Sequence, residues 1–202
     1  MDTFKEKLKN AICKNDIGFI KRYKNQFSIN ERFEDEDNDT LLLYSISDYG
    51  SNMYSYFMEN GADIALKNDE GENLIHSIIY SGDEKRLELI KKAYPSGMKA
   101  MINARSKDGV TPLLLAISLE NFDLANKLIS YGADVNIGDN DGVTPIHLAA
   151  QYSNSMFVSN LLDNGANFRI KTKIGNYPLA LAVNADRDDV VKLLYSKTYK
   201  LS

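Results

Sequence analysis

Two histidines and one cysteine are the residues of this chain whose chemistry best suits catalysis or metal binding: His76, His147 and Cys13. An imidazole can act as a general base or a metal ligand near neutral pH, and a thiolate can act as a nucleophile. Three such groups cannot supply a usual structural zinc site, and one cysteine cannot form an internal disulfide. No nucleophile–base pair, phosphate-binding loop or set of paired ligands occurs at a mechanistic spacing. The sequence therefore predicts no enzyme activity and no cofactor, and Cys13 is expected to be a buried, inert thiol on an apolar helix face.

An acidic segment at residues 31–39 (ERFEDEDND) is the other candidate for chemistry, because it carries six acidic residues and one arginine. Calcium loops also alternate carboxylates, but this segment lacks the central glycine and final glutamate of a helix–loop–helix calcium loop. One interpretation is a solvated hairpin tip. Another is an electrostatic contact with a partner through Glu34 and Asp35. An enzyme or a metal-dependent switch that uses this segment with His76 is the alternative hypothesis.

Length, composition and charge limit the class of protein. The chain has 202 residues, of which 44% are hydrophobic and 26% are charged, so it can form a core and is not disordered as a whole. Its net charge of -4 makes nucleic acids and anionic membranes poor partners. No apolar run approaches the ~20 residues of a membrane span, and the N-terminus has no apolar signal region. Since a single cysteine suits a reducing compartment, the prediction is a cytoplasmic protein that binds neither nucleic acid nor membrane.

The elements that position these residues follow from a sequence repeat. Pro112, Pro145 and Pro178 recur at one constant interval, and each is followed by an apolar run. The same frame places two earlier units at Thr40 and Asn73. A second marker agrees with it, because in three units a glycine recurs at a fixed distance beyond the threonine position. Between the markers, apolar residues recur at helical spacing, so each unit is predicted to be helix, tight turn, helix and loop.

The repeated residue types have structural roles that account for the pattern without catalysis. Proline fits the first turn of a helix, where its missing N–H has no intrahelical partner, and a threonine before it can cap the helix. Glycine can adopt the left-handed conformation that ends the second helix. We expect Thr111 and Thr144 to be caps, Gly132 to be such a glycine, and Ala149 to let helices pack closely. A single unit buries its apolar face only against its neighbours, so the stack forms the core.

In these residues the sequence resembles the ankyrin repeat, whose pattern runs D-x-x-G-x-T-P-L-H-x-A-A and then L-L-x-x-G-A-D-V-N. The segment DNDGVTPIHLAA at residues 139–150 matches it almost position by position, and the resemblance covers roughly residues 30–197. It implies an all-α solenoid of about six stacked helix-turn-helix units with short β-hairpin-like loops. It also implies that His76 and His147, at the H of the motif, make structural hydrogen bonds between hairpin backbones.

Departures from the pattern mark irregular units. Thr40 and Asn73 lack the following proline, and Tyr177 stands in place of threonine. A few additional residues near 94–101 (YPSGMKAM) are expected to lengthen the second helix or the loop of the unit that begins at Asn73. The whole chain is predicted to be one domain, 1–202, with these parts: an N-terminal capping helical pair at 1–30, repeats at about 31–65, 66–103, 104–136 and 137–169, and a C-terminal capping repeat at 170–202.

Candidate binding residues follow from the resemblance, because in ankyrin stacks the hairpin tips and inner helices line a concave surface that binds other proteins. Exposed Tyr80, Leu119 and Tyr152 would form a ladder that anchors an interface, and partial burial against the next helix is the alternative for each. The resemblance directs the two residues after the L-A-A stretch of each first helix into the concavity: Ser47, Asp48, Tyr80, Ser81, Ser118, Leu119, Gln151, Tyr152, Asn184 and Ala185.

Charge differs between the hairpin tips. The tip at 31–39 is acidic, whereas the tip at 169–173 carries three basic residues and no acidic one. Complementary charges steer association and fix the orientation of a partner. The charged residues predicted to contact a partner are therefore Glu34, Asp35, Lys107, Lys171 and Lys173.

The predicted function is that of a non-enzymatic module that binds another protein on its concave face. The free chain is expected to be a monomer. Two kinds of biological role fit this function: an inhibitor or toxin-neutralising immunity protein, and an adaptor or effector protein of a host pathway. A fold of this kind serves many roles, so it does not choose between them.

Overall fold

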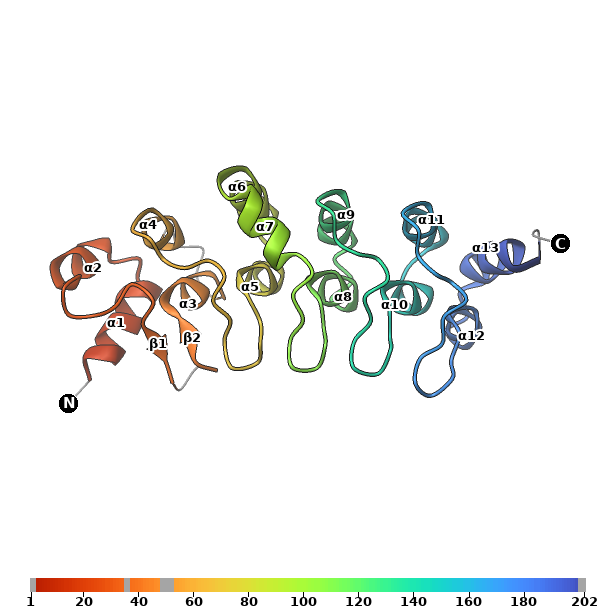
Figure 1. The fold of residues 1–202 in the computed structure, drawn as a ribbon, viewed down its shortest axis with the longest axis horizontal. Coiled ribbons are helices and arrows are strands. Elements are labelled where there is room, and N and C mark those ends of the chain that lie inside the picture. The colour runs from red at the N-terminus through yellow and green to blue at the C-terminus, as the bar shows by residue number, and fades with distance from the viewer. Residues whose placement is uncertain (1–2, 35–36, 48–52, 200–202) are drawn as a thin grey trace. The chain divides into compact units, whose positions relative to one another are not determined.

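Helices make up most of the residues that the computed structural model describes, which are 3–34, 37–47 and 53–199. These residues form thirteen helices and one two-stranded β hairpin, which confirms the predicted all-α class. The chain divides into two compact units, residues 1–101 and residues 102–202, and each is described by itself. Both units contain paired helices joined by hairpin loops (Figure 1). The single domain at 1–202 and the repeat bounds within it stay a prediction.

The N-terminal unit (residues 1–101) begins with a helical pair, as the sequence predicts for residues 1–30. The first helix of the next pair, α3, packs against both α4 and α5. Leu8, Ile12 and Ile20 of the N-terminal pair are fully buried. The helices of this unit are α1 (Phe4–Cys13), α2 (Ile17–Tyr23), α3 (Leu41–Ser47), α4 (Met53–Glu59), α5 (Leu74–Ser81), α6 (Glu84–Ala93) and α7 (Pro95–Met101).

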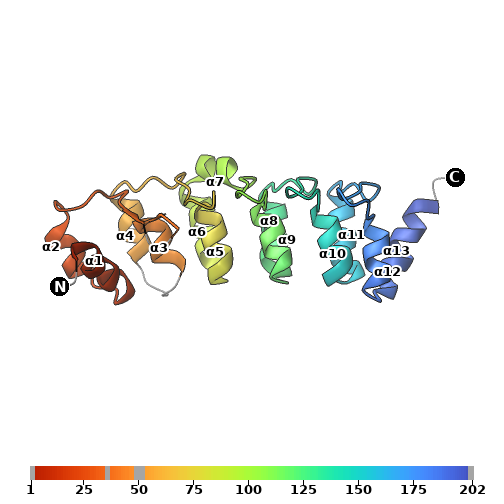
Figure 2. The ribbon, with the colours of Figure 1, turned by 90° about the horizontal axis from the view of Figure 1, so that it is seen from below.

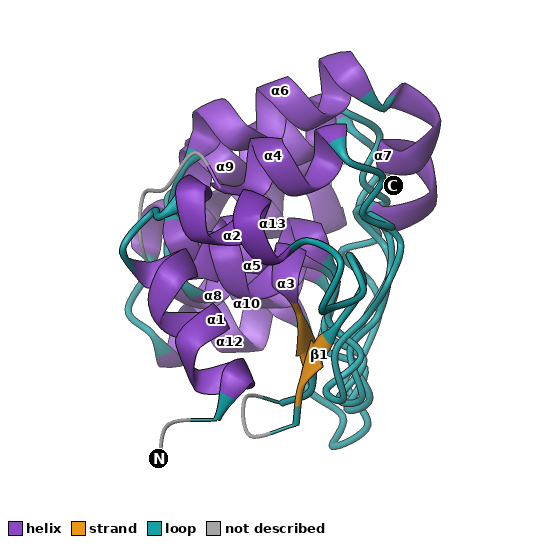
Figure 3. Cartoon of the chain, turned by 90° about the vertical axis from the view of Figure 1, so that its left-hand side faces the viewer, coloured by secondary structure: helices purple, strands orange, loops and turns teal. Residues whose placement is uncertain are grey.

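The acidic segment of the N-terminal unit forms the β hairpin. Strand β1 (Arg32–Phe33) is antiparallel to β2 (Asp39–Thr40), with Arg32 opposite Thr40 and Phe33 opposite Asp39. The hairpin leads directly into α3, at the loop side of the helices (Figure 3). Phe33 is fully buried and its ring lies edge-on to that of Tyr44, with 4.9 Å between the centroids. An apolar anchor on β1 therefore holds the acidic hairpin against the helices.

A third helix occupies the irregular unit, where the sequence predicted only a longer second helix or loop. Helix α6 ends at Ala93, and Pro95 begins the separate helix α7. Proline cannot continue α6, because it has no backbone N–H and disfavours helical backbone at the residue before it. Met98 and Met101 of α7 are buried, and the side-chain amide of Asn73 donates to the Met101 carbonyl at 2.9 Å. The additional residues therefore form a packed element of their own.

The C-terminal unit (residues 102–202) contains three helical pairs. Helices α8, α10 and α12 are the first helices of these pairs, and α10 packs against both α8 and α12 (Figures 1 and 2). Helices α9, α11 and α13 are their respective second helices. The bounds are α8 (Pro112–Ser118), α9 (Phe122–Ser130), α10 (Pro145–Tyr152), α11 (Ser155–Asp163), α12 (Pro178–Asn184) and α13 (Asp188–Tyr199).

The first helices of the C-terminal unit begin at the prolines that the sequence predicts as helix starts. A proline is the first residue of α8, α10 and α12. The hydroxyl oxygen of Thr111 accepts a hydrogen bond from the Leu114 amide at 3.3 Å, which confirms this threonine as a cap. Ala149 of α10 and Ala182 of α12 are fully buried. Because these side chains are small, α10 and α12 can approach closely.

Hydrogen bonds join successive hairpins of the C-terminal unit. The Asn140 amide donates to the Asp108 carbonyl at 2.9 Å. The side chain of Asn136 makes two further links, because its oxygen accepts from the Asn167 amide at 2.8 Å and its nitrogen donates to the Gly165 carbonyl at 3.0 Å. These bonds satisfy backbone groups in loops that have no helical partners. They fix the tips of neighbouring hairpins relative to each other.

Candidate protein-binding surface

The two histidines are structural. Both are fully buried. The Thr144 amide donates to His147 Nδ1 at 3.2 Å, so the proton lies on Nε2, which donates to the Asn176 carbonyl in the next hairpin at 3.1 Å. This confirms the predicted hydrogen bond between hairpins. His76 accepts from the Asn73 amide through Nδ1 at 3.3 Å. Neither ring is available to a substrate.

Burial lowers the pKa of His147 below its ordinary value of 6.5, and the hydrogen bond to the Asn176 carbonyl only partly opposes this effect. The folded state therefore favours the neutral ring. The unfolded chain binds a proton as the pH falls through 6.5, whereas the folded chain does so only at lower pH. The contribution of neutral His147 to stability is therefore complete above this ordinary pKa and decreases as the pH falls through it.

Replacing His147 with glutamine should reduce the dependence of stability on pH. At about pH 8 we expect the variant to lose about 1–2 kcal/mol of unfolding free energy, because a buried hydrogen bond is weakened. Between about pH 7 and pH 5 the parent should lose stability faster than His147→Gln. Urea denaturation of both proteins at several pH values measures this. A stability difference that is constant over the whole range would contradict the lowered pKa.

Cys13 is half-buried rather than buried, which corrects the prediction from sequence. It is the last residue of α1. The sulfur lies 3.6 Å from the hydroxyl of Tyr44. Within residues 3–34, 37–47 and 53–199, no three His, Cys, Asp or Glu side chains come together as a possible metal site.

The residues predicted to point into the concavity lie at or just beyond the C-terminal ends of the first helices, and the charged candidates lie in the hairpins. Asp35 and Asp48 lie outside the described residues, as does the side chain of Ser47. The hydroxyls of Ser81 and Ser118 each donate to a carbonyl of their own helix at 2.8 Å. Asn184 is exposed, whereas Gln151 and Ala185 are half-buried.

Three large side chains at these helix ends are exposed to solvent, as the sequence predicts. Leu119 is 50% exposed, Tyr152 is 37% exposed and Tyr80 is 53% exposed. Leu119 and Tyr152 are one repeat apart and occupy equivalent positions at the ends of α8 and α10. Tyr80 instead corresponds to Gln151, one position earlier in the repeat, and one position turns a helix by about 100°. Tyr80 therefore lies on a different side of its own helix from the side that Leu119 and Tyr152 occupy on theirs.

The Tyr80 hydroxyl is already engaged within the N-terminal unit. It donates to Oε1 of Glu72 at 2.8 Å. Partial burial, together with this hydrogen bond and the negative charge of Glu72, raises the pKa of Tyr80 to about 12. The phenol keeps its proton at physiological pH, and this proton is already used in the bond to Glu72.

The acidic hairpin is partly neutralised by a lysine from α1. Lys5 Nζ lies 3.4 Å from Glu31 and 3.6 Å from the exposed carboxylate of Glu34. Arg32 donates to the carbonyl of Asn38 in the hairpin at 2.8 Å and to that of Lys67 in the following loop at 2.9 Å, so its charge is engaged by backbone carbonyls. The charge that a partner meets here is thus smaller than the sequence count suggests. Lys107, which lies between the two charged segments in the sequence, is exposed in its hairpin.

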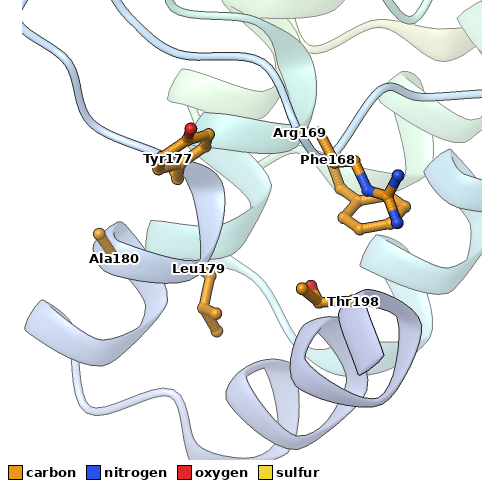
Figure 4. Close-up of a pocket in the computed structure, with 6 residues that line it drawn as sticks. All are labelled: Phe168, Arg169, Tyr177, Leu179, Ala180 and Thr198. Atoms are coloured by element: carbon orange, nitrogen blue, oxygen red, sulfur yellow. The ribbon is translucent and has the colours of Figure 1, made fainter. Parts of the chain in front are cut away.

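The basic hairpin tip at 169–173 borders an apolar pocket (Figure 4). The Arg169 guanidinium lies 5.4 Å from the centroid of the Phe168 ring, and Lys171 Nζ lies 4.9 Å from that of Tyr177. Lys173, two residues after Lys171 in the sequence, is also exposed. The bases are evident from the sequence, but the pocket is not. It has a volume of about 350 Å³ and is lined by Phe168, Arg169, Tyr177, Leu179, Ala180 and Thr198.

Two arginines outside the predicted set of residues bind the ends of first helices. Arg86 of α6 is buried and donates to the Ile46 carbonyl at the end of α3 at 3.0 Å. Arg187 donates to the Gln151 carbonyl at the end of α10 at 3.1 Å. A guanidinium suits this place, because the last carbonyls of a helix lack partners and carry partial negative charge. The two arginines occupy different positions of the repeat frame, so no spacing could have identified them.

Comparison with known families agrees with this geometry of paired helices and hairpins. A family model described as ankyrin repeats (3 copies) matches residues 42–139 and 113–202, which together cover well over half of the chain. The chain belongs to the ankyrin-repeat family. Ankyrin repeats are protein–protein interaction modules and are generally not catalytic. In the described parts of this ankyrin-repeat chain, no helix is both long and apolar enough to cross a bilayer.

The similar proteins share only part of their length with this ankyrin-repeat chain. The phosphocholine transferase AnkX of Legionella pneumophila is 29% identical over 101 residues, which are 50% of this chain and 10% of that protein. The nuclear factor NF-kappa-B p100 subunit of Xenopus laevis is 30% identical over 83 residues, or 41% of this chain and 9% of that protein. A putative ankyrin repeat protein, L675, of Acanthamoeba polyphaga mimivirus is 25% identical over 111 residues, which are 55% of this chain and 21% of that protein. The chain thus covers a small part of each relative.

Proposed function

We propose that this chain is a non-enzymatic module that binds a partner protein on the concave face of its ankyrin repeats. The observation that carries the proposal is the exposure of Leu119 and Tyr152 at equivalent positions of adjacent repeats. Tyrosine is enriched among residues that dominate binding energy, and the neighbouring leucine extends the apolar area that a partner can cover.

Polar and charged groups around these two side chains suit the rim of an interface. Ser118 and Gln151 precede Leu119 and Tyr152, respectively, and Asn184 is exposed at the end of the next first helix. A polar rim excludes water from the apolar centre of an interface. Charged groups at the hairpin tips, including Lys107, support faster association with a partner of complementary charge.

The role of such a module depends on what the bound partner can still do. An inhibitor or an immunity protein would occlude a functional surface of its partner. An adaptor or an effector would leave the partner active and bring it to another protein. The similarity to a phosphocholine transferase covers 10% of that protein, so we do not assign its activity to this chain. We propose instead a cytoplasmic monomer that acts without a cofactor.

Binding should be lost when the exposed pair is truncated. The partner is first identified by affinity capture from the source organism and mass spectrometry. Calorimetry with the purified partner then compares the parent with Leu119→Ala and Tyr152→Ala. We expect Tyr152→Ala to weaken binding by about 2 kcal/mol, because a central tyrosine contributes strongly to an interface.

The matched control is Met156→Ala, which removes an exposed apolar side chain from α11, the second helix of the same repeat. It should bind like the parent. If Tyr152→Ala binds normally and Met156→Ala does not, the partner lies on the other side of the repeats. The activity of the partner in the presence of the chain separates an inhibitor, which abolishes it, from an adaptor, which does not.

A further inference from the structure

The last repeat of the C-terminal unit exposes apolar side chains at positions that the preceding repeat buries. Tyr177 and Val183 are 43% and 53% exposed, whereas Thr144 and Ala150, at the same positions of the preceding repeat, are 3% and 0% exposed. The difference arises because α12 packs on α10, while α12 is itself the last of the first helices in the described residues. The face that receives a helix in the preceding repeat is therefore open in the last one.

This open face combines an apolar ridge with the pocket. Leu179 and Val183 are one helical turn apart on α12, so they lie on the same side of the helix. Leu179 also lines the pocket, together with the rings of Phe168 and Tyr177 (Figure 4). A volume of about 350 Å³ is at the lower end of the range for ligand pockets and suits a few large apolar side chains. We call this surface, residues 168, 177, 179, 180 and 183, the open repeat face.

The charges at its border select the chemistry of an occupant. Arg169 and Lys171 lie over the two aromatic rings of the pocket, and Lys173 of the same hairpin tip is exposed. Carboxylates on a partner would therefore be attracted to this border. A second copy of the chain is a poorer occupant, because a two-fold dimer would bring the same basic tips together.

We propose that the open repeat face binds a helical segment of a partner protein that presents apolar side chains flanked by carboxylates. The occupant is helical because the equivalent face of α10 receives the helix α12. Its apolar side chains fill the pocket and cover Val183, and its carboxylates face Arg169, Lys171 and Lys173. This inference rests on the proposed protein-binding function and adds a second contact surface and the chemistry of the segment that occupies it.

A pair of synthetic peptides tests the proposal. Both are amphipathic helices of about 18 residues with leucines on one face, and they carry either glutamates or lysines on the other face. Fluorescence anisotropy measures their binding to the full chain. We expect the glutamate peptide to bind at least about tenfold more tightly than the lysine peptide, and this difference to shrink at high salt. Equal binding of the two peptides would overturn the proposal.

Variants locate the site. Val183→Glu should weaken binding of the glutamate peptide by about tenfold or more, because it places a like charge on the apolar ridge. Met156→Glu, an equivalent change at a side chain that is 77% exposed on α11, should bind the peptide like the parent. Circular dichroism confirms that both variants are folded. Parent-like binding by Val183→Glu would overturn the proposal, and so would sedimentation that shows a dimer abolished by Val183→Glu, since the occupant would then be a second copy.

The proposed function is tested separately by the Leu119→Ala/Tyr152→Ala double variant. It should bind the glutamate peptide like the parent, even though it loses the natural partner. If the peptide does not bind while partner binding still depends on Leu119 and Tyr152, only the inference about the open repeat face fails. If the double variant also loses the peptide, the peptide occupies the concave face and the inference is overturned.

Discussion

Replacing Gly109 with alanine is expected to lower the free energy of unfolding by about 3 kcal/mol. Two effects contribute to this loss: a disfavoured backbone conformation and a steric overlap with the next hairpin. Gly109 has φ of 80°, in the left-handed region where a side chain is disfavoured. A Cβ at this position would lie 2.7 Å from the Asn140 backbone nitrogen and 2.6 Å from its side-chain oxygen. That nitrogen donates to the Asp108 carbonyl, so the added methyl would push neighbouring hairpins apart. Urea denaturation measures the loss.

Gly132 provides the matched control for this prediction. It also has a positive φ, 98°, but a Cβ there would meet no atom within 4 Å. Gly132→Ala should therefore cost only about 1 kcal/mol, from backbone conformation alone. The difference between the two variants isolates the contact between hairpins. Equal losses would mean that the hairpin around Gly109 moves freely and that the bond between Asn140 and Asp108 contributes little.

Replacing Arg86 with alanine should lower the free energy of unfolding by about 3 kcal/mol, because the substitution removes one member of a largely buried ion pair together with its hydrogen bond. Arg86 is 4% exposed, and its guanidinium donates to the Ile46 carbonyl at 3.0 Å, pairs with Asp83 at 3.1 Å and lies over the Tyr54 ring at 5.0 Å. Truncation leaves the Ile46 carbonyl without this donor and leaves a void beside the ring. Thermal and urea denaturation of Arg86→Ala measure the effect.

Arg187→Ala is the control, because Arg187 makes the same kind of bond from a more exposed position. It is half-buried and donates to the Gln151 and Tyr152 carbonyls at 3.1 and 3.5 Å. Water can replace these bonds, so the expected loss is about 1 kcal/mol. A loss for Arg86→Ala no larger than that for Arg187→Ala would show that burial adds nothing to this contact.

The repeat frame could be predicted from the sequence because its signals act over a few residues. Pro112 starts α8 after the capping Thr111, and Gly132 has the expected left-handed backbone. The role of His147 was inferred from the resemblance and holds, because the motif places its ring against the next hairpin. Each of these features depends on the backbone of one repeat and its direct neighbour.

The candidate binding surface could be predicted only in part. The exposure of Leu119 and Tyr152 follows from their place at the ends of first helices. The direction of Tyr80 was not recognised, because an offset of one residue in the repeat frame turns a side chain to another side of the helix. The neutralising contact of Lys5 with Glu31 and Glu34 was also missed, since it depends on how α1 lies against the acidic hairpin.

The amino-acid sequence was sufficient to predict the family, the helical class and the roles of the prolines and glycines, since a repeated local signal specifies the same unit each time. Three properties became visible only in the packed chain: residues 95–101 form a separate helix, Arg86 is buried, and Val183 is exposed where Ala150 is covered. These properties depend on which segment packs opposite a residue. Two residues at the same position of a repeat therefore differ in burial and in binding capacity when their neighbours differ.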